Sequence, residues 1–370
     1  MIKDIEIKKE LPSIVIPEKA TGAVLRILKA ENLLPNIKGL QYIFSEENGK
    51  RILLSENVNQ LPQSINDLNS DLKIEKTLVV LDYKNFTLQE LLRAFIPEHI
   101  VIPSSFETIG HIAHLNLQDE HAPYKHLIGE AIILKNSNIK TVAAKVGAIS
   151  SVYRSMDLEV LAGESNFVTE VHQSGFMFKL DFSKVYWNSR LQHEHDSVVE
   201  TFKEGSLVCD AMCGIGPFAV RAAKIKRCTV LANDLNPDSY KWLKENCELN
   251  GVAESVFCFN MDAREFIKKV FREGGCDYIV MNLPGTAIEF LDAIGESAIL
   301  HKDTARMPIV VFHAFDTKED HFEKSLKERA QRYLGLPLPN MTIKIVRDIS
   351  PGKNMFRCSF STADIFLRQQ

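Results

Sequence analysis

From Ser206 onward, short apolar runs alternate with segments of helical spacing. The apolar runs are 207–212, 229–232, 256–260, 278–281 and 309–312, and the helical segments are 217–224, 237–250, 263–271, 286–294 and 318–333. Strands that alternate with helices form βαβ units, in which the strands pair in parallel and helices cover the sheet. The pattern therefore predicts an α/β fold with a doubly wound, mostly parallel sheet over residues 196–370.

The last two strands of this region depart from the alternation. Segments 342–347 and 355–360 are separated by a Ser-Pro-Gly-Lys-Asn turn with no helix, which predicts an antiparallel hairpin. A parallel sheet closed by such a hairpin is the Rossmann-like architecture of class I S-adenosylmethionine-dependent methyltransferases. A nicotinamide-binding fold would normally continue with βαβ units.

The first turn between strand and helix contains two glycines, Gly214 and Gly216. Glycine lets the backbone turn sharply and lets a ligand approach closely, because it has no Cβ. The dinucleotide-binding fingerprint requires a third glycine where this chain has Ala219, and it would not place an acid such as Asp210 at the end of the strand. An acid there suits the ammonium of a methionine moiety better than a pyrophosphate.

Two further acids follow successive strands. Asp234 comes 20 residues after Gly214, where doubly wound folds use an acid to accept hydrogen bonds from ribose hydroxyls. Asp262 ends the next strand and is placed to accept from an adenine amino group. Either aspartate alone could simply cap the next helix, but the pair after a glycine turn favours nucleoside binding.

The fourth strand ends in Met281-Asn-Leu-Pro-Gly285, where Asn282 offers both donors and an acceptor at the sheet edge. The motif resembles the [DN]PPY element of methyltransferases that act on nitrogen, but it lacks the second proline and the aromatic residue. A nitrogen target recognised by Asn282 remains an expectation, and an ordinary turn before a helix is the alternative.

Just before the sheet, residues 190–200 have helical spacing, which places Arg190 and Glu194 on one face. Composition alone favours a surface ion pair between them, which contributes little to stability. His193 and His195 flank Glu194, but residues two apart point to different faces of a helix. We therefore expect no metal site.

The rest of the chain is expected to form two smaller domains. Residues 1–94 predict a small α+β domain without recognisable chemistry. Residues 95–195 contain short β-rich runs, among them 129–134, 141–146 and 176–181, and predict a β-rich domain.

Composition limits the class of protein. The 45% of hydrophobic and 25% of charged residues are typical of a globular protein, and no run reaches the ~18 apolar residues of a membrane span. The seven cysteines form no CxxC pair and are expected to be reduced packing residues. The first ten residues lack the apolar core of a signal peptide. These features predict a cytoplasmic or nuclear monomer and leave the mitochondrial matrix open.

The formal charge is only −4, from 44 Lys+Arg and 48 Asp+Glu. This balance argues against a protein that holds nucleic acid mainly through a large positive field, but it allows a local basic groove.

Several motifs in the same order resemble those of the archaeal and eukaryotic tRNA (guanine-37-N1)-methyltransferases. They extend over roughly residues 95–360, and residues 1–94 carry only a weak likeness. The segments that carry the resemblance are 103–116, 124–129, 152–164, 181–191, 214–218, 234–237, 282–284 and 288–292.

The resemblance implies an enzyme that methylates N1 of guanine 37 in tRNA with S-adenosylmethionine. It implies that Glu194 is the general base, that Arg154 stabilises negative charge on guanine O6, and that Asn282 contacts the base edge. The implied cofactor-binding residues are His195, Gly214, Asp234, Leu235, Asp262, Ala263 and Asn282. The implied substrate-binding residues are Tyr186, Arg190 and Pro284, and Arg190 is expected either to orient Glu194 or to contact a phosphate. The guanine must leave the anticodon-loop stack to reach such a site.

Three alternatives stay open at this point. The aminocarboxypropyl transferases of the wybutosine pathway share the fold and the cofactor but transfer another group. A nicotinamide-dependent oxidoreductase is disfavoured by Ala219 and by the C-terminal hairpin. A catalytically silent tRNA-binding module is disfavoured because every expected active-site residue is present.

Overall fold

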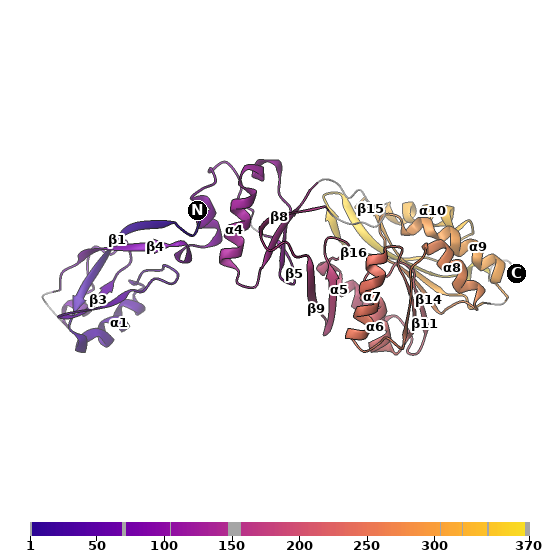
Figure 1. Ribbon diagram of the computed structural model, residues 1–370, viewed down its shortest axis with the longest axis horizontal. Helices are drawn as coiled ribbons and strands as arrows, with labels where there is room; N and C mark the ends of the chain where they lie inside the picture. The colour runs from indigo at the N-terminus through magenta and orange to yellow at the C-terminus, as the bar shows by residue number, and fades with distance from the viewer. Residues whose placement is uncertain are drawn as a thin grey trace. The chain divides into compact units, whose positions relative to one another are not determined.

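The computed structural model describes residues 2–68, 72–103, 105–146, 157–303, 305–319, 321–338 and 340–366. The chain divides into two compact units (Figure 1). The first consists of Met1–Glu107, Ala113–Ala144 and Glu159–Ser165, and the second of Thr108–Ile112, Lys145–Leu158 and Asn166–Gln370.

This division differs from the three domains expected from the sequence, with boundaries after residues 94 and 195. Residues on both sides of each expected boundary share a core. Leu92 packs in one cluster with Ile128 and Ile132, and Phe178 packs in another with Val198. Side chains that share a core fold together, so a boundary drawn from a change in sequence texture does not separate them.

Over residues 2–68 and 72–103, the first unit contains a four-stranded antiparallel sheet in the order β2-β3-β1-β4. The strands are β1 (Glu6–Ile16), β2 (Ile43–Glu46), β3 (Gly49–Leu53) and β4 (Glu75–Asp82). The helices are η1 (Glu18–Ala20), α1 (Thr21–Ala30), α2 (Gln63–Asn66), η2 (Tyr83–Asn85) and α3 (Leu88–Arg93). Ile14, Ile16 and Ile52 of the sheet pack against Val24 and Leu28 of α1.

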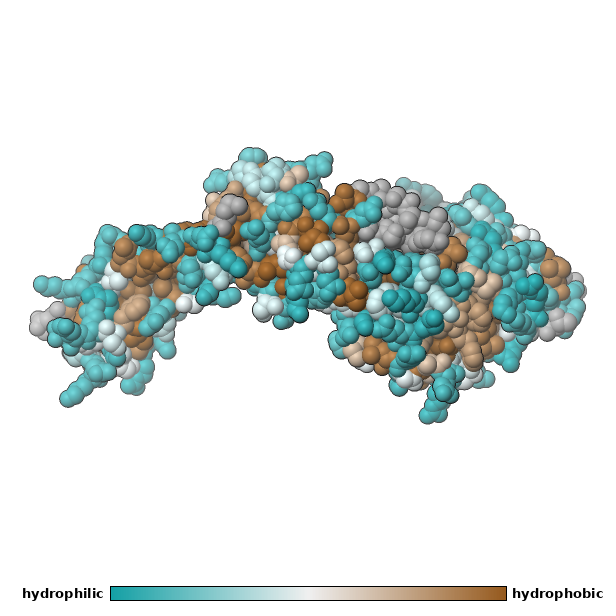
Figure 2. Space-filling model, in the orientation of Figure 1, coloured by the Kyte–Doolittle hydropathy of each residue, from teal (hydrophilic) through white to brown (hydrophobic). Residues whose placement is uncertain are grey.

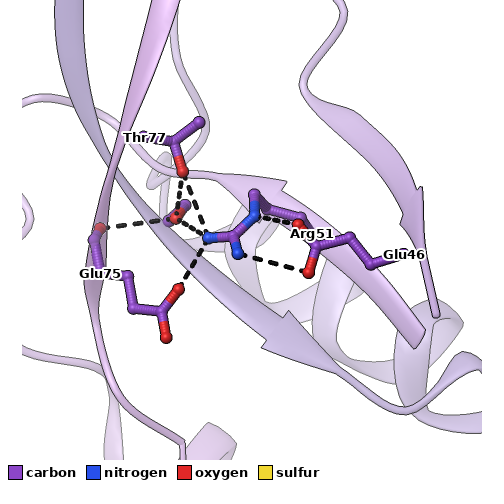
Figure 3. A network of polar contacts seen from close by, with 5 residues as sticks. Glu46, Arg51, Glu75 and Thr77 are labelled. Carbon is purple, nitrogen blue, oxygen red and sulfur yellow. Dashed lines mark hydrogen bonds and ion pairs between the residues drawn. The ribbon is translucent and has the colours of Figure 1, made fainter. Parts of the chain in front are cut away.

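Arg51 on β3 links the strands of this sheet (Figure 3). Its guanidinium pairs with Glu46 of β2, and it donates to Ser13 of β1 at 2.9 Å. It also donates to Glu75 and Thr77 of β4, at 2.9 and 3.2 Å. The two carboxylates raise the pKa of Arg51. The network itself is polar. The surface over the part of the unit that holds β1 and β4 is hydrophobic, as Figure 2 shows.

The middle of the chain contains a helix where a strand was expected. Strands β5 (Glu107–Ile109), β6 (Ile112–Leu115), β7 (Thr141–Lys145) and β8 (Leu158–Gly163) form a sheet in that order, and η3 (Asp119–Tyr124) and α4 (Lys125–Lys135) follow β6 in the chain. The strand predicted at 129–134 is wrong, because these residues belong to α4. A short apolar run does not distinguish a buried strand from a buried helix. A Cβ at Gly129 would lie 2.9 Å from Cβ of Leu161, so glycine allows close packing there.

The strands predicted at 141–146 and 176–181 are present as β7 and β10. β9 (Val168–Gln173) and β10 (Phe176–Asp181) form an antiparallel hairpin. Ser174 and Gly175 connect the two strands with φ angles of 50° and 81°, as a tight hairpin turn requires. The side chains of Asn246 and Asn250 hydrogen-bond to the backbone of β10 and attach the hairpin to α7 (Pro237–Leu249).

In the described part of the second unit, seven strands form a sheet in the order β13-β12-β11-β14-β15-β17-β16. Pairing is parallel from β13 to β15, and β17 is antiparallel to both of its neighbours. The strands are β11 (Leu207–Asp210), β12 (Thr229–Asn233), β13 (Val256–Phe259), β14 (Tyr278–Met281), β15 (Ile309–Thr317), β16 (Thr342–Ser350) and β17 (Lys353–Ser361). The predicted parallel sheet and its C-terminal hairpin are therefore confirmed.

Helices cover both faces of this sheet (Figure 1). The remaining elements are η4 (Ser189–Leu191), α5 (Gln192–Glu200), α6 (Pro217–Lys226), α8 (Ala263–Arg272), η5 (Ala287–Phe290), α9 (Leu291–His301), α10 (Phe322–Leu334) and α11 (Ala363–Phe366). Successive residues of a strand point to opposite faces of the sheet, so each face has its own core. On one face, residues such as Val208 pack with α5, α6 and α7. On the other face, residues such as Cys209 pack with α8, α9 and α10. Within the described ranges, no helix is long and apolar enough to cross a membrane.

Candidate functional site

A cavity of about 520 Å³ opens at the carboxyl ends of the parallel strands. The strand order reverses between β11 and β14, and ligands of open α/β sheets bind beside such a reversal. Eight residues that the sequence analysis singled out line this cavity: Tyr186, His195, Gly214, Asp234, Leu235, Asp262, Ala263 and Asn282. The volume is that of a typical small-molecule site.

The glycine turn contributes Gly214 and Ile215 to the lining of the cavity. Gly214 and Gly216 have φ angles of 56° and 96°, a region that L side chains rarely adopt. A Cβ at Gly216 would lie 2.7 Å from Cδ1 of Leu243, whereas a Cβ at Gly214 would meet no atom within 4 Å. Gly216 is therefore required for packing, and Gly214 leaves room for a ligand.

Asp234 is held in place by backbone N–H groups. Its Oδ2 accepts from the N–H of Gly214 at 2.8 Å, and its Oδ1 accepts from the N–H of Asn236 at 2.9 Å. Burial raises the pKa of Asp234, and these hydrogen bonds oppose the rise. The N-cap of α7 is Asn236, whose side chain accepts from Asp238 N–H. Asp234 is thus not a helix cap and is available to a ligand.

Asp262 and Asn282 occupy the ends of the next two strands along the chain. Asp262 caps α8 by accepting from Arg264 N–H at 2.8 Å, which confirms the helix-cap interpretation, and it also lines the cavity. Oδ1 of Asn282 is buried with no hydrogen-bond partner among the described residues. An unpaired buried acceptor is costly, so a bound donor would be favourable here.

Asp210, at the end of β11, is fully buried directly before the lining residues 211–215. Neither of its carboxylate oxygens meets a hydrogen-bond partner at normal geometry within the described part of the chain. Burial, together with the nearby charge of Asp234, raises the pKa of Asp210 to about 8. The backbone N–H groups of Met212 and Ala219 oppose this rise, and a cation nearby would oppose it further.

This pKa predicts a pH dependence of folding. A carboxyl group whose pKa is raised in the folded state stabilises the fold fully below its unfolded pKa, and this contribution is lost as the pH rises through about 8. We expect the free energy of unfolding to fall by roughly 1 kcal/mol per pH unit between about pH 5 and 8, and the Asp210→Asn variant to lack this slope.

Urea unfolding followed by tryptophan fluorescence measures this slope. Trp187 and Trp242 are the two tryptophans of the chain, and both belong to the second unit, so the signal reports that unit alone. Equal slopes for the native chain and the Asp210→Asn variant would contradict the prediction.

His195 is held by a buried polar network. Its Nδ1 lies 3.4 Å from Oε1 of Gln173, which also accepts from Arg221 at 2.8 Å. Arg221 is fully buried and pairs with Asp196 at 2.9 Å. Its Cζ lies 5.3 and 5.4 Å from the ring centroids of Phe176 and Phe178. Burial, and then the charge of Arg221, place the pKa of His195 well below its ordinary value. A neutral imidazole therefore faces the cavity.

Glu194 is buried, 7% exposed, and its partners are not those expected from helical spacing. Its Oε1 lies 2.7 Å from Nε2 of His313 and 3.5 Å from Nη1 of Arg357. Arg190 is exposed and belongs to η4, so the expected surface pair with Glu194 is absent from the ion pairs of the described residues. In the same ranges no group of three or more His, Cys, Asp or Glu side chains could hold a metal ion.

Only some of the residues expected to bind the target base lie together in the structure. Tyr186, Asn282 and Pro284 line a smaller cavity of about 40 Å³ that shares residues with the larger one. Arg347 also lines it, with a buried Nη1 that has no hydrogen-bond partner among the described residues. Arg154 lies outside the described residues.

Several residues of the site were not predicted from the sequence. The larger cavity is also lined by Trp187, Thr286 and Phe290. Cζ of Arg264 lies over the ring of Phe290, 4.3 Å from its centroid. His313 and Arg357 had a visible signal, because each is a polar residue within a strand of a buried sheet. Their contact with Glu194 could not be read from the sequence, since the two strands are distant from α5 along the chain.

Comparisons with known proteins agree with this geometry. Residues 169–333 match the TRM5/TYW2 methyltransferase domain, and residues 88–166 match the TYW2 N-terminal domain. A Trichomonas vaginalis protein named tRNA (guanine(37)-N(1))-methyltransferase is 64% identical over 364 residues, which cover 98% of this chain and 96% of that protein. A Batrachochytrium dendrobatidis protein of the same name is 35% identical, with 95% and 85% covered. The crystal structure of Trm5b from Pyrococcus abyssi is 28% identical with a TM-score of 0.61, covering 95% of this chain and 99% of that one.

Proposed function

The chain belongs to the TRM5/TYW2 methyltransferase family, and we propose that it is a tRNA (guanine(37)-N1)-methyltransferase. In this reaction the methyl group of S-adenosylmethionine is transferred to N1 of guanine 37 in the anticodon loop. The observation that carries the proposal is the 64% identity, over nearly the whole of both chains, to a protein of that name.

The larger cavity fits S-adenosylmethionine, which supplies an electrophilic methyl group on a sulfonium sulfur. Asp234 and Leu235 would hold the ribose, and Asp262 and Ala263 the adenine. Gly214, where a Cβ would meet no atom within 4 Å, leaves open space for the methionine moiety. The ammonium group of that moiety would favour the ionised form of Asp210, which lies directly before the lining residues 211–215. His195 and Asn282 complete the set of lining residues that we assign to the cofactor.

We assign the proton transfer to Glu194. N1 of guanine carries a hydrogen that must leave as N1 gains the methyl group, so the reaction needs a general base. The Glu194 carboxylate would take this proton, and the electron pair of the N1–H bond would form the new bond to the methyl carbon. The bond from that carbon to the sulfonium sulfur would break, and its electron pair would stay on the sulfur. Asn282, Tyr186 and Pro284 would hold the extruded base in the smaller cavity, which must widen to admit it. Arg190 would contact a phosphate. Arg154 keeps its expected role at O6 as a hypothesis from the sequence.

A second function is favoured by one observation, the match of residues 88–166 to the TYW2 N-terminal domain. A protein of that branch would transfer the 3-amino-3-carboxypropyl group instead of the methyl group. This reaction breaks a different bond to the same sulfonium sulfur, so the products distinguish the two functions.

The test uses the purified chain, S-adenosylmethionine and two tRNA transcripts that differ only in G37 or A37. We expect 1-methylguanosine from the G37 transcript and no product from the A37 transcript. Mass spectrometry of the digested nucleosides detects either product. A 3-amino-3-carboxypropyl nucleoside would replace the main proposal by the second one, and the absence of both products would contradict both.

A further inference from the structure

Two side chains of the central sheet hold one oxygen of Glu194. His313 lies on β15 and Arg357 on β17, directly opposite each other in the antiparallel register of these strands. Residues opposite each other project to the same face of a sheet. His313 is fully buried, and both side chains contact Oε1 of Glu194, at 2.7 and 3.5 Å.

Further contacts keep this pair and α5 together. Nη1 of Arg357 donates to Oγ of Ser197 at 3.1 Å, one helical turn beyond Glu194. The His313 ring lies 6.2 Å from the ring of Phe218, measured between centroids, and its Nδ1 is buried without a hydrogen-bond partner among the described residues. The ring therefore has no competing hydrogen bond within that part of the chain.

The hydrogen of the His313–Glu194 contact can be placed from chemistry. An ionised carboxylate only accepts hydrogen bonds, so Nε2 of His313 carries the hydrogen and donates it to Oε1. Among the described residues, the recorded partners of Glu194 lie on Oε1, and none lies on Oε2. The carboxylate thus has one oxygen engaged by the sheet and one oxygen left for another proton donor.

We propose that His313, assisted by Arg357, is a positioning residue for the catalytic base. It holds Oε1 and so presents Oε2 to the N1–H group of the target guanine. The proposal rests on the proposed function, in which Glu194 is the base. His313 does not line either cavity of the site and acts through Glu194. A base contributes fully only when its accepting atom is held within hydrogen-bond reach of the proton.

The test measures single-turnover methyl transfer to G37 tRNA by the full chain. His313→Leu removes the donor at similar volume, and we expect the rate to fall 10- to 100-fold, with the KM for tRNA and for S-adenosylmethionine within threefold of the native values. His313→Gln offers an amide N–H in place of Nε2–H, and we expect it to recover the rate to within about fivefold.

A double variant separates positioning from damage to the fold. His313→Leu should not slow the reaction further in a Glu194→Gln background, because His313 acts through the Glu194 carboxylate. General loss of packing would slow both backgrounds equally. Val311→Ala is the matched packing control, since Val311 lies on the same strand and packs in the core on the face of α5. We expect its rate to stay within threefold of the native rate.

The outcomes also distinguish this proposal from the proposed function. A native rate in His313→Leu, a rate in His313→Gln as low as in His313→Leu, or additive losses in the double variant would each overturn the positioning role. If Glu194→Gln itself kept the native rate, the assignment of the base would fail. If the native chain produced no 1-methylguanosine, the proposed function would fail.

Discussion

Replacing Glu194 by glutamine is expected to lower the single-turnover rate of methyl transfer by about 10³-fold. Glutamine has the same shape, and its Oε1 can still accept the hydrogen bond from His313 Nε2. The NH₂ group of glutamine replaces the oxygen that would take the proton. A hydrogen-bond donor would then face the N1–H group of guanine, which is also a donor. The affinity for S-adenosylmethionine should stay within about twofold, because Glu194 does not line the larger cavity. Rapid-quench kinetics with enzyme in excess measure the rate, and calorimetry measures the affinity.

Glu200→Gln is the matched control for this experiment. Glu200 lies on the same helix, α5, but it is exposed and pairs with Lys226 at 2.9 Å. Exposed pairs of this kind contribute little to stability, so we expect native rates. Native activity in Glu194→Gln would rule out Glu194 as the base.

Replacing Asp234 by alanine is expected to weaken the binding of S-adenosylmethionine by roughly 10- to 100-fold. The carboxylate accepts from the N–H groups of Gly214 and Asn236, at 2.8 and 2.9 Å. Alanine removes the acceptors of the Gly214 and Asn236 N–H groups and also removes the acceptor that we assign to the ribose hydroxyls. Titration calorimetry with S-adenosylmethionine alone measures this loss without tRNA.

The control for Asp234→Ala is Asp238→Ala. Asp238 lies in the first turn of α7, outside the cavity, and its carboxylate is 3.7 Å from the ammonium of Lys184. We expect this variant to bind S-adenosylmethionine with native affinity. An unchanged affinity in Asp234→Ala would refute the ribose role. Tryptophan fluorescence checks that both variants keep the second unit folded.

The features of the second unit that were predictable depend on neighbours in the sequence. Pro217 and Pro237 begin α6 and α7, and Gly216 adopts the left-handed backbone expected in the first turn. The signals that apolar runs and turn residues give extend over about ten residues, so the strands, helices and turns that they specify could be predicted directly from the sequence. Because parallel strands end at one edge, Asp234, Asp262 and Asn282 could also be placed in one site.

The errors concern segments in which local signals allow two outcomes. The run at 129–134 has the length and apolarity of a buried strand, but it belongs to α4, and its Ala131 and Ile132 lie in one core with Leu92. The two compact units also have other bounds than the three expected domains, for a related reason. Which residues share a core depends on contacts between segments that are far apart in the chain.

The sequence by itself determined the α/β sheet, its antiparallel end and the residues at the carboxyl edge, because strand alternation and turn chemistry are local. Only the tertiary structure decided the surroundings of Glu194. The spacing suggested Arg190 as its neighbour, but η4 ends at Leu191 and α5 begins at Gln192, so the two residues do not share a regular helix. The observed partner, His313, lies 119 residues further along the chain. A buried carboxylate takes the donors that the folded sheet brings to it, and β15 and β17 reach Glu194 only when the sheet and α5 pack together.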